Sequence, residues 1–215
     1  MNEMVTIVGS SYFDPISTLL EELKKHYKGH ESEVQAGCYI NGYAASICLL
    51  SVVCLESYVM RTRYIQGATG DELNKIPVTK YLQKTYSDYP YLDETNEVFV
   101  VRDLLAHNHL LKVSFDRDET GSMKKNGLNR VSSGDNKFSA NVCIDTEKTL
   151  KLGLNTSPIL VGYNDALTIL QTVWKNLIFL EGKNRNQCYV SHLYVKYQGE
   201  HVPFGEVLGM PETCT

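Results

Sequence analysis

Apolar residues near the start of the chain recur at spacings of three and four, the pattern of one buried face of an α-helix. They are Ile16, Leu19, Leu20, Leu23 and Tyr27. Asp14 and Pro15 stand just before them, and these residue types favour the cap and the first position of a helix. Gly29 follows the last apolar position and favours a helix end. The pattern therefore predicts a first helix between Asp14 and Gly29.

Two longer segments are apolar on more than one face. One covers about residues 39 to 64, and the other runs from about residue 93 or 95 to about residue 113. A helix that is apolar nearly all round lies in the middle of a bundle. An amphipathic segment over about residues 164 to 180, ended by Gly182, completes a mainly α fold. We expect an antiparallel four-helix bundle, with a short helix near residues 79 to 86.

The pattern changes between residues 114 and 160, where loop-forming residues come first and alternating segments follow. KFSANVCID and TLKLGLN alternate apolar and polar positions, which predicts a small inserted β-hairpin. CYVSHLYVKY alternates in the same way, and we expect it to form a C-terminal strand that pairs with the insertion. The expected organisation is one bundle over residues 1 to 182, with the insertion at about 114 to 160. Residues 183 to 215 form a tail on the same domain.

Composition is that of an ordinary globular protein of 215 residues, with 43% hydrophobic and 21% charged residues. The formal charge of −4 counts against broad electrostatic affinity for nucleic acid. Residues 112 to 151 are locally basic, because they hold eight Lys or Arg against six Asp or Glu. The most apolar segment, residues 44 to 55, is shorter than the roughly 20 residues of a membrane span, and residues 1 to 10 lack a secretory signal. We expect a cytoplasmic protein without membrane contact.

Six cysteines occur without a CxxC pair or zinc-ligand spacing, and we interpret them as reduced thiols. The sequence also lacks a Gly-rich phosphate loop, an HExxH motif and the Glu-x-x-His pairs of a di-iron bundle. We therefore expect no metal and no cofactor.

Polar residues on the third long helix point to chemistry, because such groups are costly on a buried helix unless they are paired or used. At about 100° per residue, Asp103 lies near 100° and His107 near 140° from Arg102. Arg supplies a planar fork of donors for phosphate oxygens, and His can move a proton near neutral pH. Asp103 lies four residues before His107 and could orient its imidazole.

The stretch VVRDLLAHNHLLKV resembles the signature of the HEPN superfamily, in which an Arg, a polar residue and three further positions precede a His. Here these are Arg102, Asp103, residues 104 to 106 and His107. ICLLSVVCLESYVM is similar to the preceding bundle helix of bacterial HEPN proteins linked to phage defence and abortive infection. The resemblance covers these two helices, and residues 12 to 182 as a helical plan.

The resemblance implies a metal-independent endoribonuclease that acts as a defence or toxin effector. The RNA 2′-hydroxyl would attack the adjacent phosphorus and leave a 2′,3′-cyclic phosphate. His107 would act as general base or acid, Arg102 would stabilise charge on the phosphorane, and Asp103 would orient. The resemblance also implies a homodimer with two motifs in one cleft, and a toxic ribonuclease needs an antitoxin or other regulatory partner.

Several alternatives stay open. The three polar residues could form a buried network that fixes helix packing, in a structural protein of a larger assembly. The domain could instead be a non-catalytic HEPN module that binds RNA, a nucleotide or a protein. Glu56 is either a partner of Arg102 or an ordinary acidic residue at a bundle end. His109 also fits a looser spacing from Arg102 and is either a packing residue or a second contact to substrate. Arg185 and His192 fit a longer gap, but they follow the bundle and we discount them.

Overall fold

The structure is a computed structural model of the chain. It describes residues 5–27, 38–107, 111–117, 119, 123–130 and 136–210. Within these ranges the chain is mainly helical, with small antiparallel sheets, as the sequence pattern predicted.

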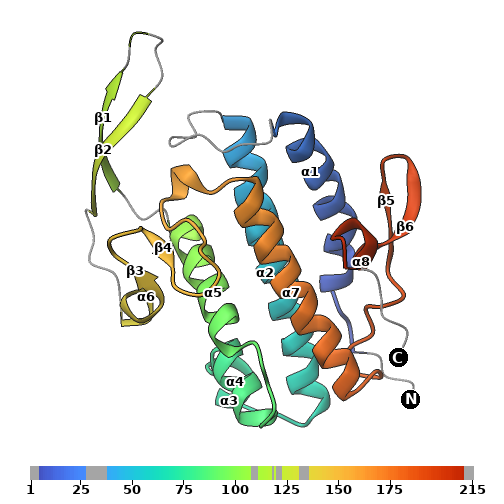
Figure 1. Cartoon of the computed structure of the whole chain (residues 1–215). Coiled ribbons are helices and arrows are strands. Elements are labelled where there is room, and N and C mark those ends of the chain that lie inside the picture. The colour runs from blue at the N-terminus through green and yellow to red at the C-terminus, as the bar shows by residue number, and fades with distance from the viewer. Residues whose placement is uncertain are drawn as a thin grey trace.

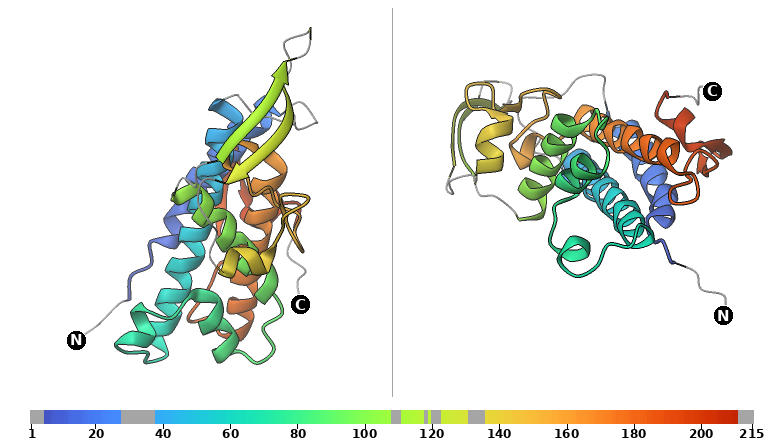
Figure 2. Two further views of the ribbon diagram at one scale, coloured as in Figure 1. Left: turned by 90° about the vertical axis from the view of Figure 1, so that its left-hand side faces the viewer. Right: turned by 90° about the horizontal axis from the view of Figure 1, so that it is seen from below.

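Four long helices lie side by side and form the body of the molecule (Figure 1). They are α1 (Phe13–His26), α2 (Cys38–Ile65), α5 (Leu92–Ala106) and α7 (Tyr163–Lys183). Helix α2 contacts α1, α5 and α7, so it is the central helix. The view along the bundle shows the same arrangement (Figure 2). Each long helix corresponds to one of the four predicted segments, although α7 continues through Gly182 instead of ending before it.

Short elements connect the long helices. Two short helices, α3 (Asp71–Asn74) and α4 (Val78–Thr85), bridge α2 and α5, and α4 corresponds to the short helix expected near residues 79 to 86. The 3-10 helix η1 (Gly9–Tyr12) precedes α1, η2 (Pro158–Leu160) precedes α7, and α8 (Phe204–Val207) follows the last strand.

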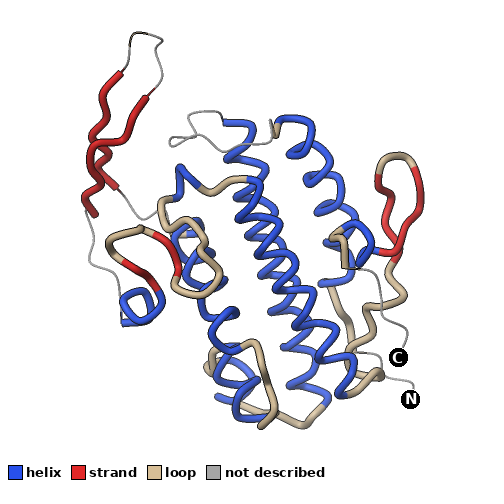
Figure 3. Tube along the Cα trace, in the orientation of Figure 1, coloured by secondary structure: helices blue, strands red, loops and turns tan. Residues whose placement is uncertain are grey.

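The third long helix ends earlier than predicted, at Ala106 rather than near Val113. Residues after it form a strand, β1 (Leu111–Arg117), which pairs antiparallel with β2 (Met123–Arg130). The segment LKVSFDR alternates apolar and polar residues, and the His-Asn-His stretch before it has low helix propensity. Leu111 and Val113 therefore follow the two-residue period of a strand and not the 3.6-residue period of a helix. The β1–β2 hairpin extends away from the helices (Figure 3).

The two segments predicted to form a hairpin in the insertion do pair, but over much less of their length than expected. KFSAN lies in a helix, α6 (Asn136–Asn141), and β3 (Val142–Cys143) and β4 (Lys148–Thr149) form only a two-residue pairing. Phe138 and Val142 pack against Val100 and Leu104 of α5. The insertion therefore covers a second face of α5, which explains why that helix is apolar on more than one side.

The predicted pairing of the C-terminal strand with the insertion is wrong. Strand β5 (Tyr194–Tyr197) pairs with β6 (Glu200–Pro203) in a local hairpin that lies beside α1. Gln198 and Gly199 connect the strands with φ of 52° and 86°, and positive φ at both positions suits a two-residue turn. The tail thus pairs with itself, and Val195, Phe204 and Leu208 join the same buried cluster as the bundle residues.

Helix α2 has the length and apolar composition of a membrane span over residues 40 to 65. Half of its most apolar window is buried inside the bundle. Its fully buried side chains include Ile47, Val52, Leu55 and Val59. Burial of each such side chain stabilises the fold by roughly 1.5–3 kcal/mol.

Two buried polar groups tie the helices to their surroundings. Glu97 of α5 is 2% exposed and accepts hydrogen bonds from the backbone N–H groups of Lys151 and Leu152, at 2.6 and 2.7 Å. Asn176 of α7 donates to Thr95 Oγ1 of α5 at 3.0 Å and to a carbonyl oxygen of its own helix. The segment after β4 and the α5–α7 contact are therefore fixed by paired polar groups as well as by packing.

Replacing Glu97 with Ala should lower the free energy of unfolding by about 2–4 kcal/mol, because two buried N–H groups lose a charged acceptor. Chemical denaturation of both proteins measures the difference. Glu22→Ala is the matched control, because Glu22 lies on the surface of α1 in an ion pair with Lys25, and it should change stability by less than about 1 kcal/mol. Equal losses in the two variants would contradict this role for Glu97.

Candidate functional site

Arg102 lies on α5 and reaches across to the central helix. Its Nη2 donates to Glu56 Oε1 of α2 at 2.8 Å, and its Nη1 lies 3.3 Å from Asp103 Oδ1. The guanidinium carbon is 5.2 Å from the centre of the Phe99 ring. The Arg102 side chain is 27% exposed, although its Nε is buried. Of the two interpretations of Glu56, the structure shows the contact with Arg102.

Lys137 is a member of the cluster that the sequence did not indicate. It comes from α6, and its Nζ lies 3.0 Å from Asp103 Oδ2 and 5.2 Å from the centre of the Phe99 ring. The sequence shows that the insertion is locally basic. It does not show that α6 packs on α5, because the alternation of residues 137 to 141 predicts a strand there and not a helix. Asp103 therefore bridges two cations, one from its own helix and one from the insertion.

His107 does not lie in the middle of a helix, as the sequence pattern suggested. It follows the last residue of α5, with φ −99° and ψ 6°, and its backbone N–H donates to the Asp103 carbonyl oxygen at 3.0 Å. Its side chain is exposed. The hydrogen bond to Asp103 keeps the His107 backbone in the last turn of α5, although the residue is the C-cap of the helix. His109 lies outside the described residues.

The cluster balances its fixed charges. Arg102 and Lys137 are cations, and Glu56 and Asp103 are carboxylates, with side chains between 27% and 38% exposed. Ion pairs that are open to water contribute only about 0–1 kcal/mol each. A phosphate group can therefore exchange with a carboxylate on either cation without a large loss of stability. The arrangement suits an anion that arrives from solvent beside exposed His107.

The structure shows no candidate metal centre in its described ranges, since no group of three His, Cys, Asp or Glu side chains gathers there. Burial raises the pKa of the Cys48 and Cys54 thiols far above the ordinary value and raises that of Cys188 to about 12. These three thiols stay protonated and act as apolar packing groups. Cys143 differs, because it is half-buried and its hydrogen bond with Thr146 lowers its pKa.

Comparisons with protein-family models, with curated proteins and with solved structures found no match. The cluster that joins α2, α5 and α6 is called the α5 site. It contains the contacting side chains of Glu56, Arg102, Asp103 and Lys137, together with His107, which is bonded to Asp103 through its backbone.

A double-mutant cycle on Arg102→Ala and Glu56→Ala separates a packing role from a role in ligand binding. We expect a coupling energy of about 0.5–1 kcal/mol, because both side chains are partly exposed. Denaturation of the wild type, both single variants and the double variant measures it. A coupling above roughly 3 kcal/mol would mark the pair as a buried structural bridge and would contradict a site that is open to ligand.

Proposed function

We propose that the chain is a HEPN-type, metal-independent endoribonuclease whose catalytic residues are Arg102 and His107. The observation that carries the proposal is the placement of the partly exposed Arg102 side chain on α5 close to the helix end, where the exposed His107 follows. Five residues along a helix correspond to a rise of about 7.5 Å. A phosphodiester with its flanking ribose can extend over such a span.

In the proposed reaction the 2′-oxygen of a ribose attacks the adjacent phosphorus, and the bond between phosphorus and the 5′-oxygen breaks. The imidazole of His107 takes the proton of the 2′-hydroxyl or supplies one to the leaving 5′-oxygen. Arg102 binds the non-bridging oxygens and stabilises the charge that develops on them. The products are a 2′,3′-cyclic phosphate and a 5′-hydroxyl end.

Asp103 and Glu56 act as positioning residues in this proposal. The Asp103 carboxylate holds Arg102 and Lys137 side by side. The backbone carbonyl oxygen of Asp103 accepts a hydrogen bond from the backbone N–H of His107. Glu56 fixes the other edge of the Arg102 guanidinium. Lys137 adds a second cation for phosphate. We also propose that RNA is the substrate, that the protein is a cytoplasmic toxin or phage-defence effector, and that an antitoxin or other regulatory protein restrains it.

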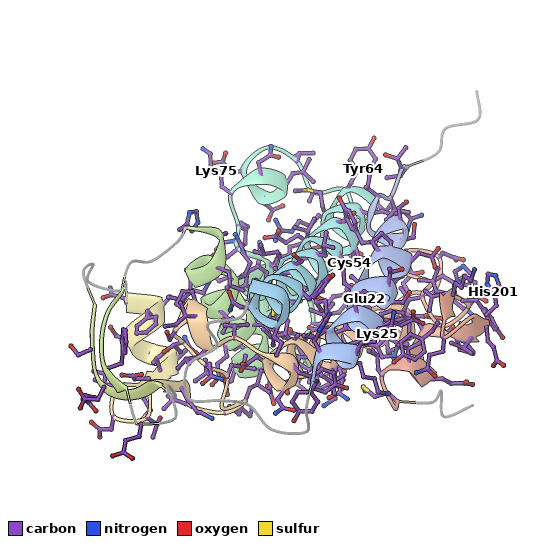
Figure 4. The ribbon with its side chains drawn as sticks, turned by 90° about the horizontal axis from the view of Figure 1, so that it is seen from above. Glu22, Lys25, Cys54, Tyr64, Lys75 and His201 are labelled. Atoms are coloured by element: carbon purple, nitrogen blue, oxygen red, sulfur yellow. The ribbon has the colours of Figure 1, made fainter. Side chains whose placement is uncertain are left out.

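We propose further that the protein is a homodimer and that it pairs through one face of α2. Leu49, Val53, Met60 and Tyr64 are at least partly exposed and recur at helical spacing, and they are called the α2 stripe here. Tyr64 points away from the bundle (Figure 4). Glu56 lies between Val53 and Met60 in the sequence. Pairing of two α2 stripes would therefore bring both α5 sites toward the same interface.

A second candidate is a non-catalytic module that binds RNA, a nucleotide or a protein partner. The balanced charges of the α5 site favour it, because two carboxylates already occupy the two cations. The presence of an exposed imidazole beside the cluster favours catalysis. Cleavage assays separate the two functions directly.

Wild-type protein incubated with total RNA in EDTA should cleave it and leave cyclic-phosphate ends. Arg102→Ala and His107→Ala should each lower the rate by at least about 100-fold, because each removes a group that acts in the transition state. Mapping of the product ends by adapter ligation measures both results. Lys175→Ala is the matched control, because Lys175 is an exposed cation on α7. Cleavage that persists in both variants, or that requires metal, would contradict the proposal.

Disruption of the α2 stripe should convert the dimer to a monomer. Val53→Asp combined with Met60→Asp places two charges in the proposed apolar interface, whereas Ile178→Asp changes an exposed residue of α7 outside it. Light scattering after size-exclusion chromatography measures the mass of each protein. A wild-type monomer, or a dimer that survives the double substitution, would rule out this interface.

A further inference from the structure

Three planar side chains stack on the surface after the end of α7. The Arg185 guanidinium carbon lies 4.3 Å from the centre of the Tyr189 ring. The same ring stacks with that of His192, whose ring centre is 3.9 Å away at an interplanar angle of 17°. All three side chains are exposed, with Arg185 66% and Tyr189 40% exposed. These residues are called the 185–192 stack.

The loop that carries the stack is held rigidly, although it lies on the surface. Cys188 and Val190 are fully buried on either side of Tyr189, so the loop is anchored in the core. Glu181 of α7 accepts hydrogen bonds from the backbone N–H groups of Val190 and Ser191, both at 2.8 Å. The stack is thus arranged before any ligand arrives, which reduces the entropy cost of binding.

Arg61 of α2 holds the other side of this loop. Its Nη1 donates to the carbonyl oxygen of Gln187, and it also reaches that of Asn186 at 3.4 Å. Besides its contact with Tyr189, Arg185 forms a long ion pair, with its Nε 3.5 Å from Glu181 Oε1. Its side chain nonetheless remains exposed.

The segment around the stack has a small excess of positive charge in sequence, although Lys183 pairs with Asp88 and Arg185 with Glu181 from outside the segment. Residues 183 to 203 hold three Lys or Arg and one Glu, with His192 and His201 in addition. The formal charge of the segment is +2, so the rest of the chain carries −6. His201 lies at the outer edge of the C-terminal hairpin (Figure 4). Local positive charge beside exposed aromatic side chains is the combination that single-stranded nucleic acids bind.

We propose that the 185–192 stack is a binding site for single-stranded RNA, in which a base extends the stack and Arg185 binds the adjacent phosphate. Stacking on aromatic and guanidinium planes suits a base of any sequence, because every base has a flat π-face.

This site is separate from the α5 site, so the inference does not depend on the cleavage proposal. Helices α5 and α7 run in opposite directions, and the end of α7 lies at the other end of the bundle from the end of α5 (Figure 1). The 21 residues of α7 correspond to a length of about 30 Å. An RNA strand that reaches both sites would have to run along the bundle.

The test uses the full chain and a fluorescein-labelled, ten-nucleotide 2′-O-methyl adenylate, which lacks the 2′-hydroxyl required for cleavage. Fluorescence anisotropy should show binding by the wild type. Tyr189→Leu keeps an apolar side chain but removes the ring, and it should weaken binding about tenfold. Tyr189→Phe keeps the ring and should bind like the wild type. Lys175→Gln is the control for charge. Each variant is also made with Arg102→Gln, so that binding at the α5 site cannot produce the difference.

The same loss upon Tyr189→Leu in both backgrounds, with an unchanged melting temperature, would support the site. Absence of wild-type binding would overturn it, as would equal affinity of Tyr189→Leu and Tyr189→Phe. An abasic strand of the same length that binds as tightly as the adenylate would also overturn it, because attraction by charge alone needs no stack. None of these outcomes bears on cleavage at Arg102 and His107, which the EDTA assay measures independently.

Discussion

The architecture depends on the need to cover α2. This helix is apolar nearly all round, and an exposed surface of that kind is unfavourable in water. Packing of α1, α5 and α7 around it buries about half of this helix's most apolar window. The same packing sets α5 against α2, which brings Arg102 within 2.8 Å of Glu56. The candidate site is therefore a consequence of how the central helix is buried, and its geometry is only as stable as that contact.

The insertion covers a face of α5 that the other long helices do not cover. Helix α5 is covered by α2 on one side and by Phe138 and Val142 of the insertion on another. Lys137 reaches Asp103 from this second side. The apolar contact between the insertion and α5 thus positions Lys137 next to Asp103. The cluster combines side chains from α2, α5 and α6. His107 belongs to the cluster by its backbone, since it follows α5 and is bonded to the Asp103 carbonyl oxygen.

The helical part of the fold was predictable because buried helices leave a strong periodic pattern, and the Glu56–Arg102 contact was foreseen as one of two interpretations. The end of α5 was not predictable from that pattern, because apolar residues at positions 111 and 113 fit both a helix that is apolar on several faces and an alternating strand. Lys137 was missed for a related reason, since KFSAN alternates like a strand but forms α6. The tail was assigned a distant partner, whereas the Gln198–Gly199 turn favours pairing with its own neighbour. In each case a short segment fits two local structures, and tertiary packing decides between them.

If the α5 site cleaves RNA by the proposed reaction, cleavage requires the ribose 2′-hydroxyl. Replacing that hydroxyl with hydrogen at one position of a substrate tests this requirement. At a cleavage position mapped in a defined RNA, one ribose would be replaced by deoxyribose while its neighbours remain unchanged. Loss of cleavage at that position alone, with other positions still cut, is the result expected for attack by the 2′-oxygen at Arg102 and His107. Undiminished cleavage at the deoxyribose would contradict it, because the nucleophile would then have to be water or a protein side chain.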